Sequence, residues 1–336
     1  MIVFLIIFTL ILLLYVIYLN YFNYHNNLIE DLKWPFLNII DENNHKVDIV
    51  CLRGPLEKQE DKNLFEKFIS EGKLIIGCSS YLSFPNKCNN PICDYNNFFY
   101  KDKRLDSIVD GWLHPFRNDN SLKSTNNILI SESDFSDNIL KLKNFDVKEK
   151  KINYDFICYC PSDEGSCNEG WNYYNKNWDL AKKTIEEACN TLNLKGILIG
   201  RENCPIDVEK DKLERHERLS YYDFIDKISQ SKFMIVSSYE DASPRIISES
   251  LLVNTPVLVY KDIIGGWKYV NEKSGLFYDE SDINLKINKI LKDNFKPREY
   301  YLNHFGVEKS GKKLRDFIVD IDPSFSRYKS LRFAVS

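Results

Sequence analysis

The segment from Ser237 to Tyr260 restricts the possible folds more than any other part of the sequence. It reads SSYEDASPRIISESLLVNTPVLVY, which predicts a strand end, an acidic turn, a short helix and a second buried strand. Ser243 and Pro244 suit a helix start, because serine is a preferred N-cap and proline is tolerated at the first helical position. Asn254 can end that helix in the left-handed conformation. A helix N-terminus beside the carboxyl end of a strand is where α/β proteins bind phosphate.

Strands and helices alternate along the rest of the chain, which predicts an α/β fold with parallel sheets and right-handed crossovers. Apolar runs rich in β-branched residues predict the strands, and apolar positions at helical spacing predict the helices. The expected strands are 46–53, 74–78, 106–110, 128–131, 154–159, 196–200, 232–237, 257–260 and 275–278, and the expected helices are 63–71, 178–192, 220–229 and one from 281.

The length of 336 residues allows roughly two domains. A charged stretch around 140–152 predicts the boundary between them. The expected organisation is a transmembrane anchor at 1–22, a polar linker at 23–45, a first domain at 46–150, a second domain at 151–310 and a C-terminal tail at 311–336.

Residues 2–19 carry no charge, and with their flanks they are long enough to cross a bilayer as a helix. The alternative is a cleaved signal peptide, but the segment lacks a basic start and a small-residue cleavage site. Tyr15, Tyr18 and Tyr21 cluster toward its end, as interfacial aromatic residues do. We therefore expect a single-pass N-terminal membrane anchor, whose orientation the flanking charges do not decide.

Charge and cysteine content set further limits. The 45 basic and 49 acidic residues are nearly balanced, so nothing indicates a nucleic-acid partner. The nine cysteines lack the spacing of a zinc site: Cys88 and Cys93 have no second pair, while Cys158, Cys160 and Cys189 fall in apolar or helical contexts typical of buried thiols. These features and the absence of an N-x-S/T sequon favour a reducing compartment and a cytosolic catalytic domain.

The opening segment resembles the donor-nucleotide motif of retaining GT-B glycosyltransferases of the family 4 (group 1) type. Asp241, Pro244, Arg245, Glu249 and the sequence TPV at 255–257 fill that pattern. The resemblance implies the GT-B fold, in which two Rossmann-like domains face a cleft. It also implies a nucleotide-diphosphate sugar as donor substrate, with no separate cofactor.

The resemblance assigns roles to the motif residues. Glu249 would accept hydrogen bonds from the ribose hydroxyls, and Asp241 would contact the donor sugar. Ser243 and the following backbone N–H groups would meet the pyrophosphate. Arg245 would lie near the phosphates or only brace the loop. Ala242 replaces the usual glycine, which leaves less room for the backbone to approach the sugar.

Three further residues complete the predicted site. Lys176 matches the cation that grips the donor pyrophosphate, where positive charge stabilises the leaving group. The additional arginine of the family falls on Trp171, so Arg201 is the candidate replacement. His114 is the candidate for a histidine that contacts the donor sugar, with a purely structural histidine as the alternative. The predicted catalytic residues are therefore His114, Asp241 and Lys176.

The sequence as a whole predicts a membrane-anchored, metal-independent hexosyltransferase-like enzyme that retains the configuration of the transferred sugar. No DxD motif occurs in a strand–loop setting, which disfavours a bound metal. The acceptor could be a glycan, a lipid or a protein. The alternatives are a GT-B enzyme of another outcome, either inverting or epimerase-like, and a degenerate fold that binds nucleotide or acts as a scaffold at a membrane. As in other GT-B proteins, the chain from 297 onward is expected to cross back to the first domain.

Overall fold

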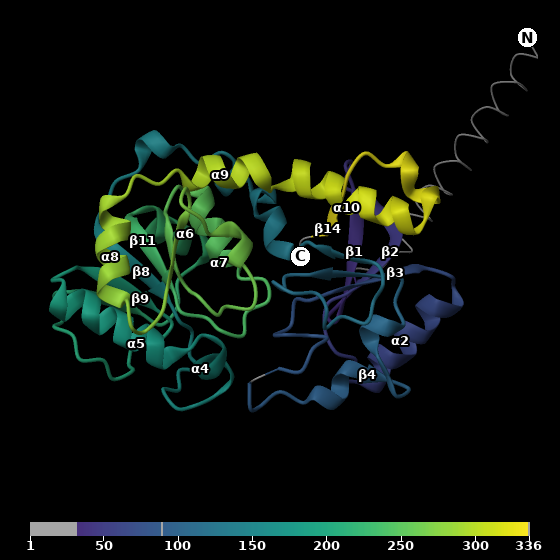
Figure 1. Cartoon of the computed structure of the whole chain (residues 1–336), viewed down its shortest axis with the longest axis horizontal. Helices are drawn as coiled ribbons and strands as arrows, with labels where there is room; N and C mark the ends of the chain where they lie inside the picture. The colour runs from purple at the N-terminus through teal and green to yellow at the C-terminus, as the bar shows by residue number, and fades with distance from the viewer. Residues whose placement is uncertain (1–31, 89, 335–336) are drawn as a thin grey trace, which may run out of the picture.

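The computed structural model describes residues 32–88 and 90–334, which form two α/β domains side by side (Figure 1). Each domain is built around a six-stranded sheet. The described part of the chain contains no helix long and apolar enough to cross a membrane. The anchor predicted at 1–22 lies outside the described residues.

The second domain has an all-parallel sheet in the strand order β10-β9-β8-β11-β12-β13. The order runs outward in both directions from β8 and β11, so these two neighbours form the topological switch point at which open α/β sheets bind ligands. Their runs are buried on both faces, which explains their continuous apolar sequences. The strands are β8 (Tyr154–Tyr159), β9 (Gly196–Ile199), β10 (Leu213–His216), β11 (Ser231–Val236), β12 (Val257–Tyr260) and β13 (Gly275–Tyr278).

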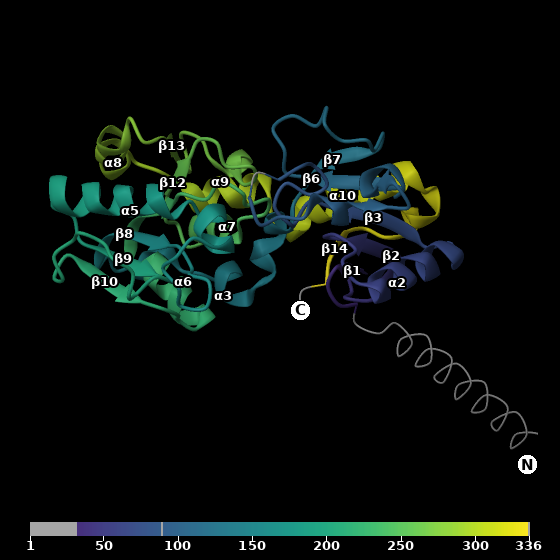
Figure 2. The same cartoon turned by 90° about the horizontal axis from the view of Figure 1, so that it is seen from below.

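Helices cover both faces of this sheet (Figure 2). One apolar cluster joins the sheet to α5 and α8, and another joins its opposite face to α6 and α7. The helices are α4 (Trp171–Asn175), α5 (Trp178–Glu186, continued by a π-turn at Glu187–Thr191), α6 (Tyr221–Ser229), α7 (Arg245–Leu252) and α8 (Ile283–Lys292).

The first domain has a mixed sheet in the order β14-β1-β2-β3-β6-β7. The strands β2, β3, β6 and β7 are parallel, whereas β1 and β14 pair antiparallel at one edge. The strands are β1 (Phe36–Asp41), β2 (Lys46–Leu52), β3 (Leu74–Cys78), β6 (Gly111–His114), β7 (Asn127–Leu129) and β14 (Leu331–Phe333), with helix α2 (Gln59–Ser70) and a short hairpin of β4 (Phe99–Tyr100) and β5 (Lys103–Arg104).

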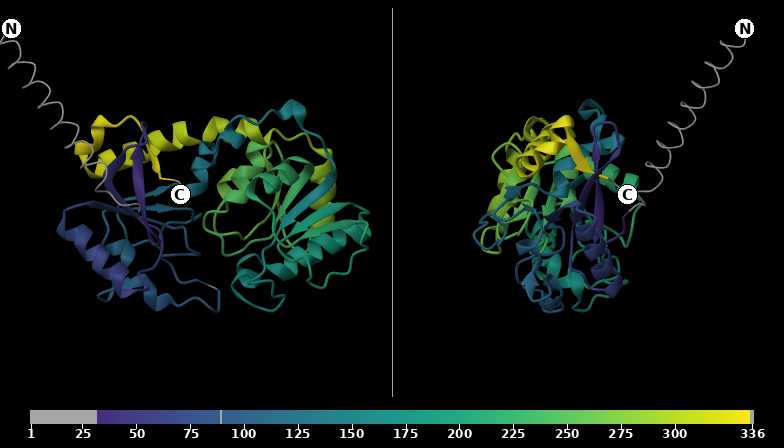
Figure 3. Two further views of the ribbon diagram at one scale, coloured as in Figure 1. Left: turned by 180° about the vertical axis from the view of Figure 1, so that it is seen from behind. Right: turned by 90° about the vertical axis from the view of Figure 1, so that its right-hand side faces the viewer.

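The C-terminal part of the chain crosses back to the first domain, as expected (Figure 3). Helix α9 (Pro297–His304) lies on the second domain, and α10 (Val307–Ile321) continues onto the first. Leu314, Phe317 and Ile318 of α10 are buried against the sheet of the first domain. The expected boundary at 310 is therefore wrong, because residues 307–333 complete the core of the first domain.

A short segment of the first domain, η3 (Glu132–Asn138), is held against the second domain by side-chain hydrogen bonds. The hydroxyls of Ser136 and Ser248 lie 2.7 Å apart, and the Tyr301 hydroxyl donates to the Ser133 carbonyl at 2.7 Å. The buried ammonium of Lys268 donates to the Asp134 carboxylate at 2.6 Å. These contacts join the domains by buried polar pairs rather than by chain connectivity alone.

Three other sequence expectations are corrected by the structure. Phe36–Asp41, inside the expected linker at 23–45, forms β1, because its apolar side chains fill both faces of the sheet edge. The expected strand at 106–110 falls on a 3-10 turn and the approach to β6. Pro244, not Ser243, is the N-cap residue of α7. The left-handed conformation of Asn254, with φ of 57°, is confirmed.

The cysteines divide into two groups. Cys158, Cys160 and Cys189 are free and buried, as expected, and Cys51 and Cys78 are free and buried as well. Cys88 pairs with Cys93, and Cys167 pairs with Cys204. Disulfides persist in oxidising compartments, so the cysteines no longer favour the cytosolic placement expected from the sequence.

The crossing helix predicts a stability effect. We expect Leu314→Ala to lower the free energy of unfolding by about 2–5 kcal/mol, because it leaves a cavity under the first sheet. Leu285→Ala on α8, whose side chain is 68% exposed, should change it by less than about 0.5 kcal/mol. Chemical denaturation of both variants measures the difference, and equal effects would contradict the packing role assigned to α10.

Candidate active site

A cavity of about 590 Å³ lies in the second domain at the carboxyl ends of the strands. Its walls come from the loop after β8, the segment after β10, and helices α6 and α7. Gly200 follows β9 with φ of +107°, and a Cβ there would lie 2.5 Å from the backbone of Pro161, so only glycine allows the β8 and β9 loops to pack this closely. The lining residues are Tyr159, Pro161, Ser162, Glu164, Gly165, Ile199, Glu217, Arg218, Leu219, Tyr221, Phe224, Arg245, Ile246 and Glu249.

Glu249 presents a buried carboxylate to this cavity. Glu249 is 3% exposed, and the Tyr221 hydroxyl donates to its Oε1 at 3.1 Å. Arg245, one turn earlier on α7, approaches the same oxygen at 3.5 Å. Burial raises the pKa of Glu249, and the Arg245 charge and the Tyr221 hydrogen bond oppose that rise. With so few neighbouring donors, the carboxylate can accept further hydrogen bonds from a ligand.

Lys176 and Asp241 meet at the switch point. Lys176 follows α4 and Asp241 follows β11, and the lysine Nζ donates to the Asp241 carboxylate at 2.5 Å. Burial disfavours the charge on Lys176, but Asp241 outweighs it, so the pKa of Lys176 is raised. The Ser237 hydroxyl also donates to the Lys176 carbonyl at 2.7 Å, which fixes the lysine backbone to the end of β11.

The Asp241 loop is positioned by a glycine. Gly265 donates its N–H to the Asp241 carbonyl at 2.9 Å. A Cβ on Gly265 would lie 1.9 Å from the Ala242 carbonyl oxygen, so a larger residue cannot occupy this position without moving the loop. Two residues later, the Trp267 Nε1 donates to the Pro115 carbonyl of the first domain at 2.6 Å.

That tryptophan contact brings the predicted His114 toward the same region, since His114 directly precedes Pro115. His114 ends β6, is 5% exposed, and stacks on Phe116. Burial lowers its pKa, and its Nδ1 has no hydrogen-bond partner among the described residues. The ring is therefore a neutral group at the edge of the first sheet that faces the second domain.

Ser243 takes a different role from the one expected. Its hydroxyl accepts from the Ser133 N–H at 3.1 Å and lies 2.9 Å from the Ser133 hydroxyl. It therefore joins the two domains in this structure. Arg245 lines the cavity with a side chain that is 47% exposed, as the phosphate interpretation requires.

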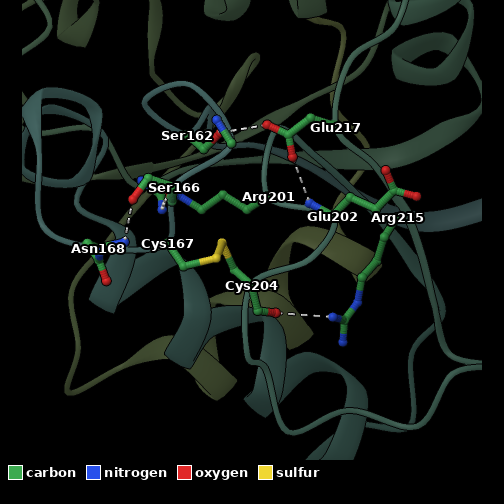
Figure 4. Close-up of a disulfide and its surroundings, with 10 residues drawn as sticks. Ser162, Ser166, Cys167, Asn168, Arg201, Glu202, Cys204, Arg215 and Glu217 are labelled. Carbon is green, nitrogen blue, oxygen red and sulfur yellow. Dashed lines mark hydrogen bonds between the residues drawn. A yellow bond between two sulfur atoms is a disulfide. The ribbon is translucent and has the colours of Figure 1, made fainter.

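Arg201 lies beneath the loop after β8 and does not line the cavity (Figure 4). Its Nη1 approaches the Ser166 carbonyl at 3.5 Å, and its guanidinium lies 4.9 Å from the Trp178 ring. The Cys167–Cys204 disulfide ties the same loop to the segment after β9. Arg201 is thus placed to support the cavity wall rather than to touch a ligand in the cavity.

Trp171, which occupies the position of the additional family arginine, packs between the domains. Its ring centroid lies 5.4 Å from that of Tyr81 in the first domain. The Asn90 side chain also crosses the interface and donates to the Asn175 side chain at 2.7 Å. Both ends of α4, including the residue before Lys176, therefore contact the first domain.

Sequence reasoning missed Glu217, Arg218 and Leu219, which form one wall of the cavity. They follow β10, a strand that was not predicted because its sequence, LERH, is polar. The signal that could have located them is Ser220, the first residue of the helix expected at 220–229, which caps α6 through a hydrogen bond from the Asp223 N–H. The residues just before that cap had to lie at the carboxyl edge of the sheet.

No protein-family profile matches the sequence, and no curated protein sequence is similar to it. Solved structures do share its fold. TarM aligns with a TM-score of 0.57 at 14% identity over 80% of this chain. The alignment covers only 54% of the TarM chain. Sucrose-phosphate synthase from Thermosynechococcus elongatus aligns with a TM-score of 0.53 at 12% identity over 77% of this chain and 72% of its own.

The lipopolysaccharide outer core galactosyltransferase WaaB aligns with a TM-score of 0.53 at 12% identity, over 81% of this chain and 75% of its own. These similarities show that the chain has the GT-B glycosyltransferase fold. The expected fold class is therefore confirmed for the two α/β domains.

The Lys176–Asp241 pair should be energetically coupled. In a double-mutant cycle with Lys176→Met and Asp241→Asn, we expect a coupling free energy of about 1–3 kcal/mol, because both side chains are less than one-fifth exposed. The exposed pair Lys296–Glu299, with 3.8 Å between charges, should give about 0.5 kcal/mol or less. Equal coupling in the two cycles would show that the pair at the switch point is not specifically held.

Proposed function

We propose that this protein is a glycosyltransferase that takes its sugar from a nucleoside-diphosphate donor bound at the switch point of the second domain. The observation that carries the proposal is the buried Glu249 carboxylate in the cavity at the ends of β8 and β9. A GT-B fold and a carboxylate with free acceptor capacity together support a nucleotide-sugar site.

In this proposal the nucleoside occupies the cavity. Tyr159 and Phe224 line it with ring centroids 5.1 Å apart, and Leu219 adds apolar surface suited to a base. The ribose hydroxyls donate to the Glu249 carboxylate. The phosphates extend toward Arg245 and Lys176, so that the sugar lies between Asp241 and the first domain.

The charges at the switch point suit the chemistry of transfer. When the bond between the sugar and the phosphate oxygen breaks, the departing diphosphate gains negative charge, and Lys176 stabilises it. Asp241 sets the position of the Lys176 ammonium before the donor arrives and then contacts the sugar hydroxyls. The neutral His114 ring can offer a hydrogen bond from the first domain without adding charge.

Retention of configuration, independence from metals and membrane anchoring through residues 1–22 complete the proposal. Cationic side chains, rather than a metal, would balance the diphosphate charge. WaaB is by name a galactosyltransferase of the lipopolysaccharide outer core, which supports a glycan acceptor for this chain. The rival function is a GT-B fold that binds nucleotide without turnover, and it is favoured by Trp171 at the arginine position and by the covered Arg201.

Transfer assays on a Glu249 variant test the proposal. Glu249→Gln removes the charged acceptor but keeps its size, and we expect nucleotide-diphosphate affinity to fall about ten- to hundredfold, which corresponds to a lost charged hydrogen bond. Sugar transfer or donor hydrolysis should fall with it. Glu308→Gln, on the exposed face of α10, is the matched control and should behave as the wild type. If wild type and variant bind nucleotide but neither turns over any sugar donor, the non-catalytic alternative holds.

The pH dependence gives a second test with opposite signs for binding and stability. Because burial raises the pKa of Glu249, nucleotide affinity should fall as the pH drops through that raised value, at a higher pH than for an exposed glutamate. Without nucleotide, Glu249 binds a proton more readily in the folded protein than in the unfolded chain. Its protonation therefore raises the free energy of unfolding over the same pH drop. Nucleotide affinity and the free energy of unfolding are measured from about pH 8 to about pH 5. The wild type should show both trends, and Glu249→Gln should show neither. The same pH slopes in wild type and variant would contradict the assignment.

A further inference from the structure

A second, smaller cavity adjoins the nucleotide cavity at the interface between the domains. Its volume is about 70 Å³, which is room for a few water molecules or one tetrahedral oxyanion. Arg53 and Glu132 line it from the first domain, and Arg245 lines it from the second. Arg245 also lines the larger cavity, so the two spaces share one guanidinium.

Arg53 has hydrogen-bonding capacity to spare. It follows β2, at the carboxyl edge of the parallel strands of the first sheet, and its side chain is 24% exposed. Its nearest carboxylate, Glu132, lies 3.4 Å from Nε and 3.5 Å from Nη1. Both distances exceed the 2.7–2.9 Å of a charge-assisted hydrogen bond. Within the described residues, the buried Nε has no hydrogen-bond partner, and such an unmet donor carries an energetic penalty.

The surroundings would strengthen binding of an anion. Leu37, Phe135 and Phe333 form an apolar part of the wall, and a low local dielectric increases the attraction between opposite charges. The Ser80 hydroxyl donates to Glu132 Oε1, the same oxygen that Arg53 Nε approaches, and so holds the carboxylate beside Arg53. Arg245 is similarly close to Glu249, at 3.5 Å. Among the charged residues that line the cavity, Arg53 and Arg245 outnumber Glu132, so the cavity carries an excess of positive charge.

We infer that Arg53 and Arg245 form an interdomain anion site that takes a phosphate group. Because Arg53 and Arg245 come from different domains, a bound phosphate would bridge them and favour the closed arrangement of the cleft. Two molecules could supply the phosphate: the terminal phosphate of the nucleotide donor, or a phosphate carried by the acceptor. The choice between these sources rests on the proposed nucleotide site, whereas the anion site itself does not.

Inorganic phosphate is the probe for the site. We expect the full-length protein to bind it, measured by calorimetric titration at low salt, and Arg53→Gln and Arg245→Gln each to weaken that binding at least tenfold. Arg53→Lys keeps the charge and should recover part of the loss. Arg327→Gln removes an exposed arginine outside the cavity and should leave the affinity unchanged. Thermal melting confirms that each variant is folded.

Nucleotide pairs then distinguish the two sources. Uridine, adenosine and guanosine 5′-diphosphates are each compared with their monophosphates in wild type and Arg53→Gln. If the donor supplies the anion, a diphosphate displaces inorganic phosphate, and Arg53→Gln weakens the diphosphate about tenfold more than the monophosphate. If the acceptor supplies it, phosphate still binds to the nucleotide-saturated protein, and only that binding is lost in Arg53→Gln.

The inference is overturned if the wild type does not bind phosphate, or if Arg53→Gln binds it as tightly as the wild type does. Failure of every nucleotide to bind would instead remove the proposed donor site and leave the phosphate result standing on its own. The two proposals therefore fail by different measurements.

Discussion

The reversal of strand order between β8 and β11 is the constraint on which the rest of the structure depends. Right-handed crossovers send the chain to opposite sides of the sheet from these two strands, so the loops that follow them must diverge. A cavity opens at this end of the sheet, between the loop after β8 and helices α6 and α7. Lys176 lies in the turn that ends the first loop and Asp241 lies in the second, so their ion pair joins the two loops.

The first domain completes this arrangement through buried polar contacts. Ser133 and Ser136 bond to serines at the start and middle of the α7 segment, and Asp134 accepts from Lys268 and Tyr269. Each contact fixes the position of one domain relative to the other, because a buried donor or acceptor without its partner is costly. The helix that presents Glu249 is thus fixed from both sides, which suits a site that must hold a ribose and position phosphates.

Most of the second domain could be predicted from its sequence because its strands are apolar throughout and its helices are amphipathic. The same logic failed for β10, where the polar run LERH pairs at a sheet edge, and for β1, whose neighbours suggested a linker. The family resemblance assigned Lys176 and Asp241 to one site, and the two form an ion pair, while Glu249 lines the cavity of the same domain. The resemblance could not place Ser243 or Arg201, since both are directed by contacts with residues distant in sequence: Ser133 for one and the disulfide-tied loop for the other.

We expect the cavity of the second domain to hold a nucleoside diphosphate, and a crystal structure of the protein with the nucleotide bound is the decisive experiment. The base should lie between Tyr159 and Leu219, the ribose hydroxyls within hydrogen-bonding distance of Glu249, and the phosphates beside Arg245 and Lys176. A nucleotide bound elsewhere on the molecule, with Glu249 still bonded only to Tyr221, would contradict it.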